Sequence, residues 1–163
     1  MSITRRPTVY LATFALGLTM TVAPVVAQST HVLVPANKVQ WGPAPPRLPA
    51  GAQVSVLEGN PAEKGAVTLR LEFPANYNIP PHWHSMAERV TVLSGVLQVG
   101  MGNTLDRHAS QTLEPGGFVS LPAKMHHFAW TATPTVVQIT LEGPFDIFYV
   151  NPADDPQKPQ TKR

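Results

Sequence analysis

The sequence predicts a single all-β domain, and three observations support this fold class. Apolar residues alternate with polar ones in several short runs, as they do along a half-buried strand. Gly, Pro and Asn separate these runs at short intervals, which is typical of a sandwich or a small barrel. After the N-terminal segment, no stretch carries a helical apolar stripe. At 163 residues, the chain has room for one domain with a substantial core.

The first 27 residues have the pattern of a cleavable signal peptide. Arg5 and Arg6 precede a short apolar run, and small residues close the segment at Ala27. This order of basic, apolar and small residues is typical of a secretory signal. A membrane anchor fits less well, because the run is short, contains threonines and is followed by Pro24. We expect a periplasmic or secreted protein with no membrane contact after the signal is removed.

The basic character of the chain belongs to this N-terminal segment. Removing residues 1–27 takes away two of the twelve basic residues and none of the ten acidic ones. The remaining charges balance, so they give no reason to expect nucleic acid or an anionic membrane as a partner. No cysteine is present, which excludes disulfides and thiolate chemistry.

Residues 28–50 are expected to form N-terminal strands and a proline-rich strap. Two short apolar pieces, 31–34 and 38–41, precede the strap at 42–50. Prolines cannot donate to a sheet, so the strap should lie extended over the surface or on a neighbouring subunit. The tail 151–163 is polar and contains three prolines, so we expect it to be flexible.

Residues 51–150 carry the predicted barrel. Its clearest strand runs from Val67 to Phe73, where odd positions are apolar and even positions are polar. Further strands are predicted at 53–57, 82–84, 89–93, 96–99, 118–121, 127–131, 135–141 and 145–150.

A group of candidate metal-ligating residues lies on or beside these strands. His82, His84 and Glu88 have even spacing, so within one strand they would face the same way. A third imidazole arrives about forty residues later from His126 or His127, and spacing alone leaves both open. Imidazoles and a carboxylate without thiolate favour one divalent metal ion, namely Fe, Mn, Ni or Zn, with open coordination positions.

Alternation of side chains along these strands also predicts the walls of the site. Trp83, Phe128 and Trp130 should face outward, into a second layer or a dimer contact. Tyr77 and Gln98 are polar candidates near the ion. The predicted pocket consists of Met86, Met125, Val90, Gln98, Phe73 and Phe118.

Two motifs resemble those of the cupin superfamily. The first is matched by His82-Trp83-His84, Glu88 and Gly95, with Asn76 where the leading glycine is usual. The second is matched by Gly116, Pro122 and His127, with Lys124 where glycine is usual and Thr131 where asparagine is usual. The resemblance covers about residues 50–150 and is closest to small, single-domain, exported bacterial cupins.

The resemblance implies a jelly-roll β-barrel with the ion inside. It implies His82, His84, Glu88 and His127 as the metal ligands, and it selects His127 over His126. Cupins commonly pair by strand exchange, so the resemblance also implies a homodimer.

Two kinds of function stay open on this basis. The resemblance suggests a dioxygenase-like, metal-dependent enzyme acting on a small oxygen-bearing molecule, with Glu88 as ligand and catalytic proton relay. Isomerase and decarboxylase activities are less favoured, and a zinc hydratase has no place for Glu88. The alternative is a non-catalytic exported cupin that binds a metal or a small ligand.

Overall fold

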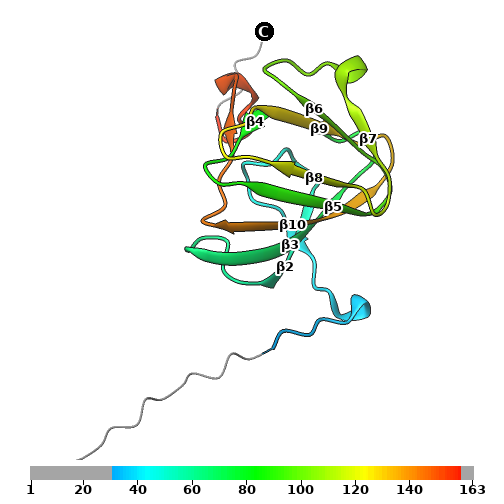
Figure 1. Ribbon diagram of the computed structural model, residues 1–163, viewed down its shortest axis with the longest axis vertical. Helices are drawn as coiled ribbons and strands as arrows, with labels where there is room; N and C mark the ends of the chain where they lie inside the picture. Colours follow the sequence, from blue (N-terminus) through cyan, green and yellow to red (C-terminus); the bar gives the residue numbers. More distant parts are fainter. Residues whose placement is uncertain (1–30, 159–163) are drawn as a thin grey trace, which may run out of the picture. The chain divides into compact units, whose positions relative to one another are not determined.

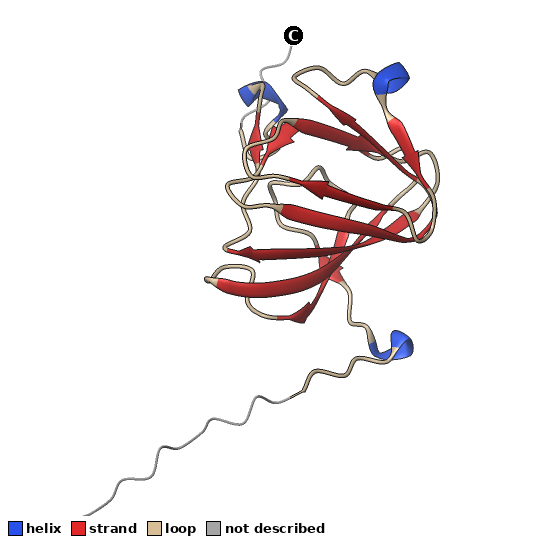
Figure 2. Ribbon diagram, viewed as in Figure 1, coloured by secondary structure: helices blue, strands red, loops and turns tan. Residues whose placement is uncertain are grey.

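Eleven strands and three short 3-10 helices make up the regular structure of residues 31–158, the part of the chain that the computed structural model describes (Figures 1 and 2). From Val32 onward these residues belong to one packed unit. None of the helices in residues 31–158 has the length and apolar character needed to cross a membrane. The predicted signal peptide at 1–27 lies outside the described residues.

The strands form two antiparallel sheets that face each other (Figure 1). Sheet A has the order β1-β2-β3-β10-β5-β8, and sheet B has the order β11-β4-β9-β6-β7. The strands are β1 Gly42–Pro43, β2 Gln53–Glu58, β3 Gly65–Phe73, β4 Asn78–Trp83, β5 Glu88–Ser94, β6 Leu97–Met101, β7 Gln111–Leu113, β8 Phe118–Leu121, β9 His127–Trp130, β10 Thr135–Gly143 and β11 Phe148–Tyr149. The helices are η1 Ala36–Lys38, η2 Arg107–Ala109 and η3 Pro152–Asp154.

The core lies between the two sheets. In β3 the odd positions from Val67 to Phe73 are buried, and β10 pairs with this strand over its whole length. Directly paired residues face the same side of a sheet, so Leu69 and Ile139 meet in the interior. Apolar side chains make up most of this interior, and the arrangement confirms the predicted all-β barrel.

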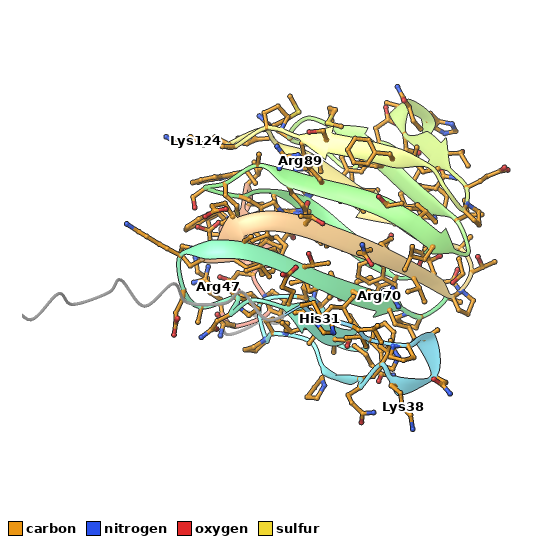
Figure 3. All side chains as sticks on the ribbon, turned by 60° about the horizontal axis from the view of Figure 1, so that its bottom comes forward. His31, Lys38, Arg47, Arg70, Arg89 and Lys124 are labelled. Atoms are coloured by element: carbon orange, nitrogen blue, oxygen red, sulfur yellow. The ribbon has the colours of Figure 1, made fainter. Side chains whose placement is uncertain are left out.

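The outward face of sheet A carries the polar alternates of the same strands. Arg70 and Arg89 lie on it (Figure 3), and Arg70 Nε donates a hydrogen bond of 3.2 Å to Gln138 Oε1 on the neighbouring strand. Long polar side chains therefore cover this face, as the period-two pattern predicted.

The two ends of the described chain differ from expectation. Residues 31–34 and 38–41 form no strand, since β1 begins at Gly42, and Leu33 is 74% exposed. In the tail, η3 is capped by the Asn151 side chain and Asp155 is buried. Local side-chain bonds of this kind order a polar segment without a hydrophobic core. Residues 151–158 are therefore structured, while 159–163 lie outside the described part.

Candidate metal centre

An irregularity in β4 determines which way its first histidine faces. Ile79 pairs with Ala129 of β9, and His82 pairs with His127, so β4 uses one residue more than its partner between these pairs. The extra residue falls at Pro80 and Pro81, whose nitrogens cannot donate to the ladder. A regular strand would turn Ile79 and His82 to opposite faces, whereas the bulge directs both inward.

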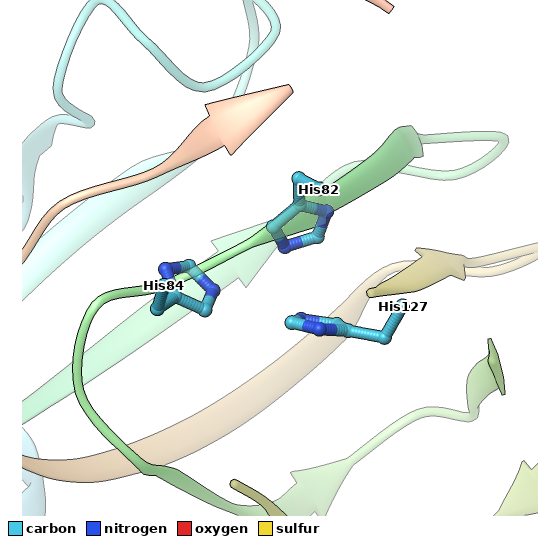
Figure 4. A group of neighbouring side chains, drawn as sticks. All are labelled: His82, His84 and His127. Atoms are coloured by element: carbon cyan, nitrogen blue, oxygen red, sulfur yellow. The ribbon is translucent and has the colours of Figure 1, made fainter. Parts of the chain in front are cut away.

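His127 enters from the next strand and completes the histidine group. The ring centroids of His82 and His127 are 4.1 Å apart, and those of His82 and His84 are 5.0 Å apart. One ring nitrogen of each histidine lies within 4.8 Å of the others (Figure 4). All three rings are buried, at most 4% exposed.

Backbone carbonyls orient the three rings. Nδ1 of His82 donates to Pro80 O at 2.8 Å, Nδ1 of His127 donates to Met125 O at 3.0 Å, and Nδ1 of His84 donates to Asp146 O. A proton held on Nδ1 leaves the lone pair on Nε2, which is the nitrogen that faces the group. Nε2 of His84 is buried without any hydrogen-bond partner among the described residues.

Glu88 reaches the same point from the opposite sheet. The strand of His82 ends at Trp83, the chain bends at Ser85 and Met86, and Glu88 opens β5 in sheet A. Its Oε2 lies 3.5 Å from His84 Nε2 and 3.7 Å from His127 Nε2. The expectation that Glu88 faces the histidines from the same strand is therefore wrong, because the bend takes the chain from sheet B to sheet A. Glu88 meets the histidines because the two sheets face each other across the site.

The environment sets the protonation of the four groups. Burial lowers the pKa of His82 well below its usual range, and the adjacent His127 and His84 lower it further. Burial also lowers the pKa of His127, against the attraction of Glu88. Burial opposes charge on His84 and Glu88 as well, but the attraction between the two groups, whose Nε2 and Oε2 lie 3.5 Å apart, outweighs it. The pKa of His84 is therefore raised and that of Glu88 lowered.

This donor set fits a divalent transition metal. His82 and His127 are held neutral, Glu88 is held ionised, and the Nε2 atoms and Oε2 face one another. These are the protonation states that metal ligands require. The unpartnered Nε2 of His84 is costly to bury unless something binds it. His82, His84, His127 and Glu88 would hold the ion.

A second layer of residues supports His84, and sequence reasoning did not identify it. The ring of Phe145 stacks on the His84 ring with centroids 5.4 Å apart. The Asp146 carboxylate accepts bonds from Ser85 N–H, at 2.8 Å, and from the Ser85 hydroxyl. The loop before β11 therefore holds the loop after β4, and no sequence spacing relates the two.

The turn before His127 keeps the backbone conformation that the cupin motif requires. Lys124 and Asn76 stand where the motif usually has glycine, and they are the non-glycine residues with positive φ in the described chain, at 63° and 58°. Lys124 N–H donates to His84 O at 2.8 Å. The turn therefore forms despite the lysine and ties the two histidine segments together.

The predicted pocket divides into residues on the cavity wall and residues elsewhere. Phe73 and Val90 line the cavity that contains His82, Glu88 and His127. Met86 packs against the core, and Gln98 bonds Thr112 on the neighbouring strand.

The interior positions expected for Met125 and Phe118 are wrong, since these side chains are 39% and 56% exposed. Met125 lies in the turn before β9, where strand alternation does not apply, and Phe118 is on the outward face of its strand.

The remaining candidates lie away from the cavity. His126 turns to the other face of sheet B, where its Nδ1 bonds Asn103 Oδ1 at 2.6 Å and its ring lies near Trp83. Tyr77 donates its hydroxyl to Pro49 O, so it holds the strap rather than the ion. Phe128 also lies on that outward face, as expected from alternation, but it is fully buried there.

Comparison with known proteins identifies the family. The model of the ChrR cupin-like domain matches residues 29–146. A germin-like protein of Arabidopsis thaliana, subfamily 1 member 1, is 40% identical over 67 residues, which cover 40% of this chain and 31% of that protein. The match spans about a third of that relative's length.

Solved structures share the fold at low identity. The polyketide cyclase RemF from Streptomyces resistomycificus superposes with a TM-score of 0.64 at 19% identity, over 80% of this chain and 96% of that one. A candidate acetylacetone dioxygenase from Methylibium petroleiphilum gives 0.62 at 18% identity, over 82% and 90%. The family model covers well over half of the sequence, including His82, His84 and Glu88, so the chain belongs to the ChrR cupin-like family of the cupin superfamily.

Proposed function

We propose that this cupin binds one divalent metal ion (Fe, Mn, Ni or Zn) and acts as a metal-dependent enzyme on a small oxygen-bearing molecule. The observation that carries the proposal is the convergence of three histidine ring nitrogens and one carboxylate inside the barrel, with the other ring nitrogen of each histidine bonded to a backbone carbonyl. Four protein ligands leave positions open on an ion that prefers six. A bound cation would supply Lewis acidity to an oxygen of the substrate.

Glu88 is the residue that we propose for proton transfer. It is the carboxylate on the wall of this cavity among the described residues, and its lowered pKa keeps it ionised. An ionised carboxylate beside the substrate would accept a proton and return it later. The same-fold structures of a cyclase and a candidate dioxygenase support the fold, whereas the chemistry rests on these residues.

Elemental analysis and oxygen uptake test the proposal together. Protein from its native compartment should contain about one equivalent of metal, and metal-loaded protein should consume oxygen with an enolic or catecholic compound. Protein that stays metal-free after equilibration with all four metals would contradict metal binding. Metal-loaded protein that is inactive on a broad panel would contradict an oxygenase.

A non-catalytic binding protein is the second candidate, and the size of the cavity favours it. The cavity has about 40 Å³ for water and its other walls are apolar, with Leu97, Val119 and Ile139 among them. Among the described residues, no second acid lines it. A ligand that raises the melting temperature without turnover would support this candidate over the enzyme.

Export and pairing are further proposals for the mature protein. Export rests on the N-terminal pattern. Pairing rests on the exposed apolar segment Val32 to Val34, which a second copy would cover. Light scattering should give a dimer, and Leu33→Ser should shift it toward monomer; a monomeric parent protein would contradict pairing.

A further inference from the structure

Leu48 lies between two hollows of the barrel. It is 5% exposed, and it lines both the metal cavity and a larger cleft of about 360 Å³ on the surface. The metal cavity, at about 40 Å³, has room for about three waters. Leu48 thus lies between the metal cavity, which is too small for an organic substrate, and the outer cleft, which is large enough for one.

The strap holds Leu48 from both sides. A tight turn brings Leu48 N–H within 2.9 Å of Pro45 O. The carbonyl of Arg47 accepts the Tyr149 hydroxyl at 2.6 Å, and the carbonyl of Pro49 accepts the Tyr77 hydroxyl. These hydrogen bonds fix the backbone on both sides of Leu48.

Both tyrosines also belong to the surroundings of the metal centre. The Tyr149 ring lies 6.1 Å from the ring of His82, which it faces across paired strands. The Tyr77 ring stacks on Phe73, a cavity wall residue, with centroids 5.1 Å apart. The position of Leu48 is thus set from the walls of the cavity that it closes.

The outer cleft has the chemistry of a site for an apolar acid. Its walls are mostly apolar, formed by Pro45, Pro46, Leu48, Pro61, Phe145 and Ile147. Of its charged groups, the Asp146 carboxylate is engaged by Ser85. Arg47 donates from Nε to Gln157 Oε1 and from Nη1 to Ile147 O, while its Nη2 has no acceptor among the described residues. An acidic oxygen of a ligand would accept a hydrogen bond from this Nη2.

We propose that the outer cleft binds the body of a small apolar molecule with an acidic oxygen, and that Leu48 decides which ligands reach the metal from it. This inference rests on the proposed metal function and specifies its substrate class. Ligands of two or three atoms fit inside the cavity, whereas an aromatic carboxylate needs the space that Leu48 occupies.

Cobalt-loaded protein tests Leu48 with two anions of different size. Azide and benzoate are titrated against the visible Co²⁺ spectrum of the parent protein, Leu48→Val and Leu48→Ala. Benzoate affinity should rise stepwise, by about tenfold or more in Leu48→Ala, while azide affinity changes less than about twofold. Leu33→Ala removes the same atoms from an exposed position and should change neither.

The charged part of the cleft is tested in the enlarged variant. Arg47→Gln in the Leu48→Ala background should weaken benzoate but not benzyl alcohol. Equal benzoate affinity in all Leu48 variants, or an equal gain for both anions, would overturn the proposal. An equal loss of benzoate and benzyl alcohol would overturn the role of Arg47.

Failure of metal binding is separable from failure of this inference. If the parent protein takes up no Co²⁺, the proposed function fails, and the metal-free protein still tests the barrier. Benzoate should then shift the NMR signals of His82 and His127 in Leu48→Ala but not in the parent. Identical shifts in both proteins would overturn the inference.

Discussion

The two faces of β9 are equally buried and have different roles. His127 and Phe128 are neighbours in the sequence, exposed by 3% and 0%. His127 faces the cavity and directs a ring nitrogen at Glu88, whereas Phe128 faces the other side of sheet B and packs over Gly100. Burial alone therefore does not separate a ligand from a packing residue; what separates them is whether polar atoms are left to bind something.

The outward face of sheet B is covered by the segment between β6 and β7. Gly102 N–H donates to His126 O at 2.9 Å, and the Arg107 guanidinium lies 4.4 Å from the centre of the Trp130 ring. Arg107 also donates to Asn78 Oδ1 at 2.9 Å. This cover makes a second small core on the far side of the metal-bearing strands.

The largest effect should come from removing the ligand on the inward face. His127→Ala should reduce metal affinity by more than the ~100-fold that loss of an outer partner costs. It removes a ligand and leaves Glu88 with one histidine neighbour fewer. Metal content after dialysis checks this, with His126→Ala as the adjacent control. Unchanged content in His127→Ala would place the ion elsewhere.

The matching change on the outward face should affect stability alone. Phe128→Ala should lower the free energy of unfolding by about 3–5 kcal/mol, because it leaves a large void. Phe118→Ala, at an exposed phenylalanine, should change it by no more than about 0.5 kcal/mol. Urea unfolding of the metal-free proteins measures both. Loss of metal from folded Phe128→Ala would show that the faces are not independent.

The contact between Gly100 and Phe128 offers a smaller change. A Cβ on Gly100 would lie 2.2 Å from Phe128 Cζ, so Gly100→Ala should cost about 1–3 kcal/mol. Phe128→Leu should relieve part of this cost in the double variant, which a double-mutant cycle would measure. Strict additivity of the two changes would rule out this packing account.

The smallest effect, a gain, is expected in the turn that leads into β9. The left-handed backbone at Lys124, with φ of 63°, lowers the stability of the fold because lysine has a Cβ, so Lys124→Gly should stabilise the protein by about 1 kcal/mol. Asn76→Gly should change stability less, because asparagine tolerates this conformation. Thermal unfolding compares the two. Destabilisation by Lys124→Gly would indicate that the lysine side chain makes a contact that matters.

Much of the barrel was predictable because its strands follow a simple period. The alternation from Val67 to Phe73 identifies β3 directly, and Gly95 marks a turn where a Cβ would meet Pro134 O at 2.3 Å. The histidines and Glu88 were predictable from residue type and spacing. The side chains that surround these ligands were harder to predict, because the alternation of inward and outward positions does not continue past a bend or the end of a strand.

Turns and distant contacts account for what the sequence did not reveal. Met125 was placed by counting from His127, but the count crosses a turn. Leu48 lies in a proline-rich strap that has no period, and its burial depends on two distant tyrosine hydroxyls. Phe145 and Asp146 support His84 across about sixty residues of chain. Such pairings arise only when the barrel closes.

The extra residue in β4 has a consequence for how such a centre is inherited or designed. His-x-His on its own does not specify an inward imidazole, because the diproline before it shifts the count of the whole strand. Deleting either proline would keep every ligand in the sequence, but Ile79 and His82 would then fall on opposite faces of β4. A design that moves this centre into another barrel therefore has to include the bulge at Pro80 and Pro81 together with the ligands.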